Sequence, residues 1–186
     1  LAICLGGLSQ AQIIELQDKR ILILGDSITQ NGTYVSFVSY FLQKRNPNFN
    51  YDIVSIGLGS ETVAGTSEDD HPFPRPCVHT RLDDALGQVK PEIVFACYGM
   101  NDGIYHPLSA ERFHNYQEGI ENLIQKVADA DAQIVLITPP LFDTSAKETL
   151  SPSGSSYYSY KSPYENYNNV LRTYGKWIML TELPVL

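Results

Sequence analysis

The stretch "ILILGDSITQNG", residues 21–32, carries the pattern that decides the fold: an aliphatic run ends abruptly at a glycine, an aspartate and a serine. Near-continuous aliphatic runs are typical of strands that are covered on both faces of a sheet. Three further runs of this kind lie at 51–59, 91–102 and 132–140, and apolar residues with helical spacing lie at 34–42 and 113–127. Alternating strands and helices predict an α/β fold, with a parallel sheet and helices on both faces.

Short polar motifs follow the aliphatic runs. "GDS" (25–27) follows the first, "GLGSET" (57–62) the second and "GMND" (99–102) the third. Parallel α/β sheets bind their ligands at the carboxyl ends of the strands. We therefore expect these three motifs to converge on one site.

Ser27 has two interpretations at the end of its strand. Its hydroxyl would lie at the carboxyl edge of the sheet, which suits a nucleophile for acyl transfer. Alternatively, Asp26, Ser27 or Thr29 merely caps the helix that follows, as such residues often do. The motif alone favours the cap, so the choice depends on what accompanies it.

The other two motifs supply hydrogen-bond donors. The side-chain amide of Asn101 can donate to an oxyanion, a contribution typically worth ~3–4 kcal/mol in the transition state. Backbone N–H groups around Gly59 and Ser60 add further donors. A dinucleotide site is the competing interpretation because Gly57 and Gly59 follow a strand, but Thr62 stands where its third glycine would fall.

Taken together, the motifs "GDSIT" (25–29), "SIGLGSETVAG" (55–65) and "YGMND" (98–102) resemble the three blocks of the SGNH (GDSL-type) esterases and acylhydrolases. Their order and spacing agree with the family, and the resemblance extends from about Lys19 to the last residue. It implies a three-layer α/β/α, flavodoxin-like sandwich around a parallel sheet.

The resemblance also implies roles for individual residues. Ser27 would be the nucleophile, and its backbone N–H would be one oxyanion donor beside the side chain of Asn101. The family's donor glycine in the second block is Ser60 here. A backbone N–H is available from any residue other than proline. We expect Gly59 to permit the turn at this position.

A serine nucleophile needs a base, usually a histidine that a carboxylate orients. The family takes both from an Asp-x-x-His block after its last strand, but residues 115–186 contain no histidine. The chain ends in "ELPVL" (182–186), which looks like the start of a further strand. We expect residues 12–186 to form an SGNH domain that is incomplete at its C-terminal end and inactive alone. The four histidines, none of them a strong candidate for the base, are His71, His79, His106 and His114.

Two long loops, 65–80 and 143–167, are rich in proline, serine or tyrosine, and such loops are often functional. We expect His71, His106 and Tyr158 to contact substrate from these loops and from the segment after Asn101. The tyrosines of the second loop would either stack on a sugar ring or pack the loop against the domain.

Neither a metal nor a cofactor is expected. Glu-x-x-His occurs at 68–71 and at 111–114, but neither stretch supplies a third converging ligand. The three cysteines show no Cys-x-x-Cys spacing, so they indicate neither a zinc site nor a disulfide framework.

The overall charge bounds the partners. Thirteen basic and twenty-one acidic residues give a net charge of −8, which disfavours nucleic acid and anionic membrane surfaces. No stretch reaches the ~18 apolar residues of a membrane span. A small ester or an acetylated carbohydrate is the favoured substrate class.

Residues 1–11 resemble the tail of a signal peptide, because an apolar segment precedes the small-x-small triplet Ser9-Gln10-Ala11. A first strand or an apolar arm is the other interpretation. The signal-peptide interpretation predicts a secreted or periplasmic protein.

These observations lead to two hypotheses. The first is a serine ester hydrolase that forms an acyl-enzyme on Ser27, with an acetylated carbohydrate as the candidate substrate. The second is a non-catalytic SGNH-like domain that lacks the Asp–His pair and binds a sugar or a lipid.

Overall fold

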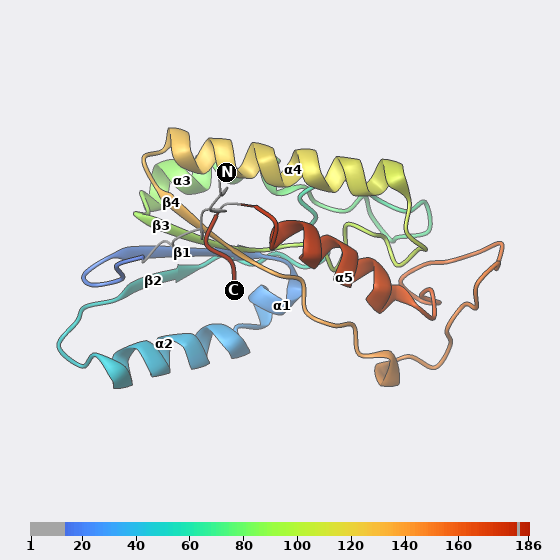
Figure 1. The fold of residues 1–186 in the computed structure, drawn as a ribbon, viewed down its shortest axis with the longest axis horizontal. Helices are drawn as coiled ribbons and strands as arrows, with labels where there is room; N and C mark the ends of the chain where they lie inside the picture. Colours follow the sequence, from blue (N-terminus) through green and yellow to red (C-terminus); the bar gives the residue numbers. More distant parts are fainter. Residues whose placement is uncertain (1–13, 182) are drawn as a thin grey trace, which may run out of the picture.

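The computed structural model describes residues 14–181 and 183–186. Four parallel strands form its central sheet in the order β2-β1-β3-β4 (Figure 1). The strands are β1 (Arg20–Gly25), β2 (Asp52–Ser55), β3 (Ile93–Cys97) and β4 (Gln133–Ile137). Each lies within one of the four aliphatic runs, so the predicted strands are confirmed.

The strand order reverses between β1 and β3. The chain leaves β1 for the outer neighbour β2 and then crosses back to β3 on the other side of β1. Segments that leave β1 and β3 therefore diverge at this point, and open α/β sheets bind ligands in the crevice that results. The "GDS" and "GMND" motifs both follow strands that flank this switch point.

Helices cover both faces of the sheet, which confirms the predicted α/β/α layering. In Figure 1, α3 and α4 lie on one side of the sheet and α2 on the other. The larger core, on the side of α3 and α4, also contains α5, whereas the smaller core on the opposite face contains Val35 of α2. The helices are α1 (Ser27–Asn31), α2 (Thr33–Arg45), α3 (Leu82–Val89), α4 (Ala110–Asp129) and α5 (Tyr167–Ile178), with 3₁₀ turns at Val78–Thr80 and Thr144–Ala146.

Alternation along the strands assigns their side chains to the two cores. Leu22 and Leu24 of β1 belong to the larger core, and Ile21 and Ile23 belong to the smaller one. Both sets are almost fully buried, which explains why this strand has no polar residue between 21 and 25.

The apolar stripe of α2 is less buried than its spacing suggests. Phe37 and Phe41 are each 60% exposed, and Val35 is the buried residue of this helix. The smaller core therefore covers its face of the sheet less completely than α3, α4 and α5 cover the other.

The last residues approach the sheet beside β4. Val185 forms a parallel bridge with Leu136, and the N–H of Leu186 donates to the carbonyl of Leu136 at 2.9 Å. This pairing agrees with the strand start predicted at the end of the sequence. The signal-peptide interpretation of residues 1–11 falls outside the described residues. No helix in the described part of the chain is long and apolar enough to cross a bilayer.

Gly57 lets α1 pack directly on the chain that leaves β2. A Cβ atom at this position would lie 2.2 Å from the backbone nitrogen of Gln30 and 2.6 Å from the carbonyl carbon of Thr29. Because both neighbours are backbone atoms, neither can move aside as a flexible side chain would. The close approach holds Ser27 and its helix beside the Gly59–Ser60 segment.

We expect Gly57→Ala to lower the free energy of unfolding by about 1–3 kcal/mol, because the added methyl group forces α1 away from its support. Urea denaturation measures this change. Gly87→Ala is the matched control, since a Cβ in α3 would meet nothing within 4 Å. That substitution should stabilise the protein by roughly 0.5–1 kcal/mol. Equal effects at the two positions would contradict the packing argument.

Candidate active site

Asp26, not Ser27, caps the helix that follows β1. Its Oδ1 accepts a hydrogen bond from the backbone N–H of Ile28 at 2.9 Å, and Ser27 is the first residue of α1. The Ser27 side chain is exposed, and no hydrogen bond to it is found within residues 14–181 and 183–186. The structure therefore leaves the Ser27 hydroxyl available at the carboxyl end of β1.

An open groove of about 420 Å³ runs alongside Ser27, between α1 and the start of α2. Its walls are mostly apolar, and it is lined by Ser27, Ile28, Asn31, Thr33, Tyr34 and Phe37. This groove could hold an uncharged group next to the Ser27 hydroxyl.

The segment after β2 forms a tight turn beside β1. The N–H of Leu58 donates to the carbonyl of Gly25 at 3.0 Å, and the N–H of Glu61 closes the turn on Leu58 at 3.2 Å. Ser60 is the third residue of this turn and has a φ of +63°, in the left-handed region. Gly59 does not have a positive φ, so the expectation that Gly59 permits the turn is wrong. The third position of such turns is the one that takes a positive φ.

Asn101 connects the ends of the three strands. Its Nδ2 donates to the carbonyl of Glu61 at 3.1 Å and lies 3.4 Å from Oδ2 of Asp26. Its Oδ1 accepts from Nη1 of Arg75 at 3.0 Å and from the hydroxyl of Tyr105 at 3.2 Å. Because a guanidinium only donates and a carbonyl only accepts, these partners fix the orientation of the amide.

The predicted site residues come together through this amide. Asp26 and Glu61 immediately adjoin Ser27 and Ser60 in the chain, and Asn101 contacts both of them. The amide is 3% exposed, so its position is set by these hydrogen bonds rather than by solvent. The structure thus brings Ser27, Ser60 and Asn101 to one edge of the sheet, as the sequence predicts.

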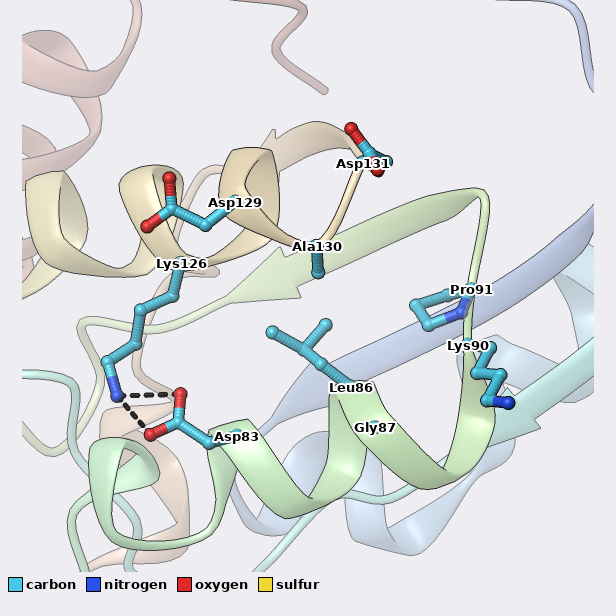
Figure 2. A pocket seen from close by; sticks show the side chains of 9 residues that line it. All are labelled: Asp83, Leu86, Gly87, Lys90, Pro91, Lys126, Asp129, Ala130 and Asp131. Carbon is cyan, nitrogen blue, oxygen red and sulfur yellow. Dashed lines mark hydrogen bonds and ion pairs between the residues drawn. The ribbon is translucent and has the colours of Figure 1, made fainter.

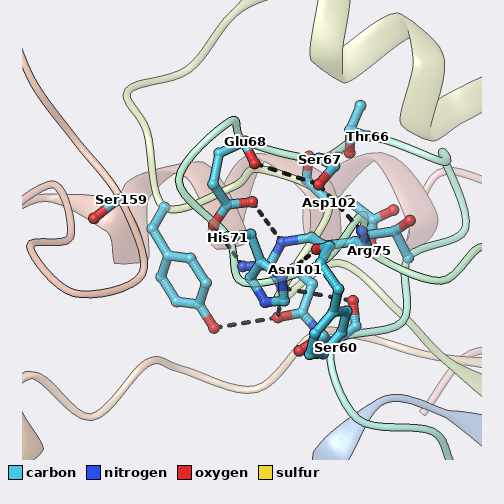
Figure 3. A network of polar contacts seen from close by, with 12 residues as sticks. Ser60, Thr66, Ser67, Glu68, His71, Arg75, Asn101, Asp102 and Ser159 are labelled. Carbon is cyan, nitrogen blue, oxygen red and sulfur yellow. Dashed lines mark hydrogen bonds and ion pairs between the residues drawn. The ribbon is translucent and has the colours of Figure 1, made fainter.

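Sequence reasoning missed a buried ion pair in the 65–80 loop. Glu68 accepts two hydrogen bonds from the Arg75 guanidinium, each 2.6 Å long, and the two side chains are only 4% and 2% exposed (Figure 3). The signal available in the sequence was a pair of opposite charges seven residues apart in a proline-rich loop. Nothing in that pattern shows that Arg75 reaches Asn101.

A second ion pair lies behind the turn. Glu61 is fully buried, and Arg81 donates to its two oxygens at 2.6 Å each. The Tyr98 hydroxyl donates to Oε2 at 2.8 Å. These bonds fix the residue that follows Ser60, so the turn is held from its buried side.

The histidine and tyrosine candidates for substrate contact lie in the loops that follow the strands. The His106 ring lies 5.6 Å from that of Tyr158, and the His71 ring lies 5.2 Å from that of Tyr160. His71 Nδ1 is 2.6 Å from the carbonyl oxygen of Phe73. The structure thus brings His106 and Tyr158 together, whereas His71 contacts Tyr160 and Phe73. Within its described residues, it does not hydrogen-bond them to the three residues of the strand ends.

The remaining histidines contact residues of α4. The Nε2 atom of His79 lies 3.1 Å from the carbonyl oxygen of Gly119 in α4. His114 lies on the exposed face of α4, 3.5 Å from Glu118. Within the described ranges, no histidine hydrogen-bonds to Ser27, and no group of three or more His, Cys, Asp or Glu side chains gathers as a metal site would.

A larger pocket, of about 650 Å³, lies at the other end of the sheet (Figure 2). It is bounded by the C-terminal ends of α3 and α4, and Lys126 forms an ion pair with Asp83 across one side at 2.7 Å. Pro91 and Asp131, which line it, precede β3 and β4. It therefore lies at the amino edge of the sheet, remote from Ser27.

Two buried carboxyl groups at the site resist ionisation. Burial raises the pKa of Asp26 to about 6, although the N–H of Ile28 lowers it and nearby Arg75 also opposes the rise. Burial raises the pKa of Asp102 to about 7, even though its Oδ1 accepts from the N–H groups of Val63 and Ala64. Its Oδ2 has no hydrogen-bond partner in the described part of the chain.

The raised pKa of Asp102 predicts a pH-dependent stability. Between its ordinary value of 3.8 and about 7, the folded carboxyl holds a proton that the unfolded one has lost. The stability that the protonated Asp102 carboxyl gives the fold is therefore complete below about pH 4 and is lost as the pH rises to about 7. Asp102→Asn keeps an acceptor for both N–H groups but does not titrate. We expect the stability of this variant relative to the wild type to increase across that interval.

Urea denaturation at about pH 4.5, 5.5 and 7 measures the difference. The exposed Asp129→Asn is the control for loss of a carboxylate. A stability difference between Asp102→Asn and the wild type that stays constant with pH would contradict the assignment.

Comparisons with known proteins agree with this fold. Residues 23–179 match the model of the GDSL-like Lipase/Acylhydrolase family. A variant of the acetyl xylan esterase Axe2 from Geobacillus stearothermophilus has a TM-score of 0.60 at 19% identity, over 88% of this chain and 71% of that chain. The psychrotrophic esterase EstA from Pseudoalteromonas sp. has a TM-score of 0.59 at 18% identity, over 91% and 76%.

At these identities the structural likeness establishes a shared fold. None of the curated proteins matches the chain significantly. The family match spans most of the chain and includes all three motifs at the strand ends. The chain therefore belongs to the GDSL-like lipase/acylhydrolase family.

Proposed function

We propose that this protein is a carboxylic ester hydrolase that acts through an acyl-enzyme on Ser27. The observation that carries the proposal is the amide of Asn101, which contacts the neighbours of both Ser27 and Ser60. Three strand ends thereby present one hydroxyl and several N–H donors at one edge of the sheet. Family membership supports ester hydrolysis as the chemistry.

In this mechanism Ser27 Oγ attacks the ester carbonyl carbon and loses its proton to a base. The oxyanion accepts hydrogen bonds from the backbone N–H groups of Ser27 and Ser60 and from Nδ2 of Asn101. One hydrogen of Nδ2 is bonded to the Glu61 carbonyl, and the other faces Asp26 across 3.4 Å, a long contact that an oxyanion can replace. The tetrahedral intermediate then collapses, and the base protonates the departing alcohol. Water hydrolyses the acyl-serine by the same steps.

We further propose that the base lies outside these 186 residues. The support is that no histidine hydrogen-bonds to Ser27 in the described ranges and that none occurs after His114. The nucleophile and the oxyanion donors would then be present here without the group that activates them.

We propose an acetylated carbohydrate as the substrate. Neighbours with the same fold include acetyl xylan esterases, and the negative net charge favours an uncharged substrate. The proposal is also supported by aromatic rings that lie close together, His71 beside Tyr160 and His106 beside Tyr158, because such rings can stack on a sugar. The resemblance of residues 1–11 to a signal peptide supports a secreted or periplasmic location, where such polysaccharides occur.

A second candidate is a non-catalytic domain that binds a sugar or a lipid in the groove beside Ser27. The absence of a histidine partner for Ser27 within the described residues favours it. The two candidates differ in whether Ser27 and Asn101 affect turnover.

We expect Ser27→Ala to reduce p-nitrophenyl acetate hydrolysis by at least ~10³-fold in the protein as its gene encodes it. Asn101→Ala should lower kcat by ~10²–10³-fold with little change in KM, because the donor acts on the oxyanion and not on the bound ester. Asn122→Ala, an exposed asparagine on α4, is the matched control. If the wild type and Ser27→Ala hydrolyse equally, the binding domain is the better assignment.

The position of the base has its own test. Residues 1–186 alone should turn over p-nitrophenyl acetate several orders of magnitude more slowly than the gene-encoded protein. Equal rates that are both abolished by Ser27→Ala would show that the base lies within residues 1–186.

A further inference from the structure

Arg75 makes contacts that neither the sequence motifs nor the family match assigns to catalysis. Its guanidinium lies between three groups at the carboxyl edge of the sheet (Figure 3). Nε and Nη2 bind Glu68, whereas Nη1 donates to Oδ1 of Asn101 at 3.0 Å and lies 3.5 Å from the carbonyl oxygen of Ser60. One side chain thus contacts both residues that would supply oxyanion donors from outside α1.

The guanidinium is itself held rigidly. The two 2.6 Å bonds to Glu68 form a planar fork, and the Arg75 carbon Cζ lies 5.6 Å from the centre of the Tyr105 ring. Both charged side chains are almost completely buried. Because Glu68 neutralises the charge at close range, Arg75 contributes mainly a fixed donor direction rather than a free positive charge.

We propose that Arg75 is a positioning residue for the oxyanion hole. It holds Oδ1 of Asn101 so that Nδ2 faces the site. Its contact with the Ser60 carbonyl, at 3.5 Å, is at the limit of a hydrogen bond and contributes little beside this. Glu68 serves this arrangement by fixing the guanidinium. The proposal rests on the hydrolysis at Ser27 put forward above.

The amide of Asn101 needs such a restraint because its terminal torsion is soft. With the amide reversed, Oδ1 would face the carbonyl oxygen of Glu61 and the carboxylate of Asp26, so three acceptors would meet without a donor. Arg75 and Tyr105 both donate to Oδ1 in the observed orientation. Of Arg75 and Tyr105, Arg75 is the one that also contacts Ser60.

The competing explanation is that the Arg75–Glu68 pair only stabilises the 65–80 loop. A stabilising role would lower the amount of folded protein and would act independently of Asn101. A positioning role would lower kcat at an unchanged KM, and its effect would disappear once the Asn101 amide is absent. The two explanations therefore differ in a double-mutant cycle.

In the gene-encoded protein, we expect Arg75→Met to lower kcat for p-nitrophenyl acetate by about 10–100-fold with KM within about threefold, because a displaced donor stabilises the oxyanion poorly. Arg75→Lys should recover part of the loss, since an ammonium can still donate to Oδ1 of Asn101. In the Asn101→Ala background, Arg75→Met should change kcat by less than about threefold.

Val127→Ala, in the buried face of α4, controls for lost stability alone. It should lower the melting temperature without a change in kcat per folded molecule. The proposal is overturned if Arg75→Met lowers kcat equally in the wild-type and Asn101→Ala backgrounds. The proposal is also overturned if Arg75→Met changes only KM, or if it lowers only the folded fraction as Val127→Ala does.

A measurement without turnover separates this proposal from the proposed function. In ¹⁵N-labelled protein, the side-chain amide hydrogens of Asn101 should exchange with solvent at least about tenfold faster in Arg75→Met than in the wild type or in Val127→Ala. Unchanged exchange would overturn the positioning role even if Ser27 hydrolyses esters. Faster exchange together with activity that is insensitive to Ser27→Ala would instead contradict the proposed function and leave the positioning of Asn101 supported.

Discussion

The hydrogen bonding of the Asn101 amide is the interaction on which the rest of the site depends. β1, β2 and β3 each end in a polar segment, and backbone pairing reaches only the first residues of these segments, as in the Leu58–Gly25 hydrogen bond. The amide joins them, because its nitrogen faces Glu61 and Asp26 while its oxygen accepts from Arg75 and Tyr105. A single buried side chain thus sets the relative positions of groups that are distant in the sequence.

Two arginine–carboxylate pairs surround this amide: Arg75 with Glu68, both buried, and a half-buried Arg81 with the buried Glu61. Burying such charges is expensive, and apolar residues of similar size often stabilise a protein equally well. The pairs are better understood through geometry, since a planar fork of hydrogen bonds fixes direction as well as distance. One pair restrains Asn101 and the other restrains the residue after Ser60, so both act on the same edge of the sheet.

The sequence was informative where a pattern depends on local physics. The strands and their order of appearance could be predicted because buried parallel strands are continuously apolar, and α4 could be predicted from its spacing. Asp26 and Ser27 could not be distinguished as caps, because both residue types fit an N-cap and the choice depends on where helix α1 begins. Arg75 could not be predicted at all, since its contact with Asn101 depends on the path of an irregular loop.

The expectation that Gly59 permits the turn was wrong for a related reason. Glycine permits that conformation but does not require it, and the hydrogen bond of the turn places Ser60 there.

The torsion angle at Ser60 bears on how members of this family are identified from their sequences. For the oxyanion donor proposed above, this position needs a main-chain N–H on a left-handed residue, and that N–H does not depend on the side chain. The residue at this position therefore has to tolerate a positive φ. Glycine adopts this conformation most easily, and serine, asparagine or aspartate can adopt it at a modest cost. A search pattern that demands glycine at this point would reject chains in which the turn is intact. A pattern written for residues that tolerate the conformation would retain them.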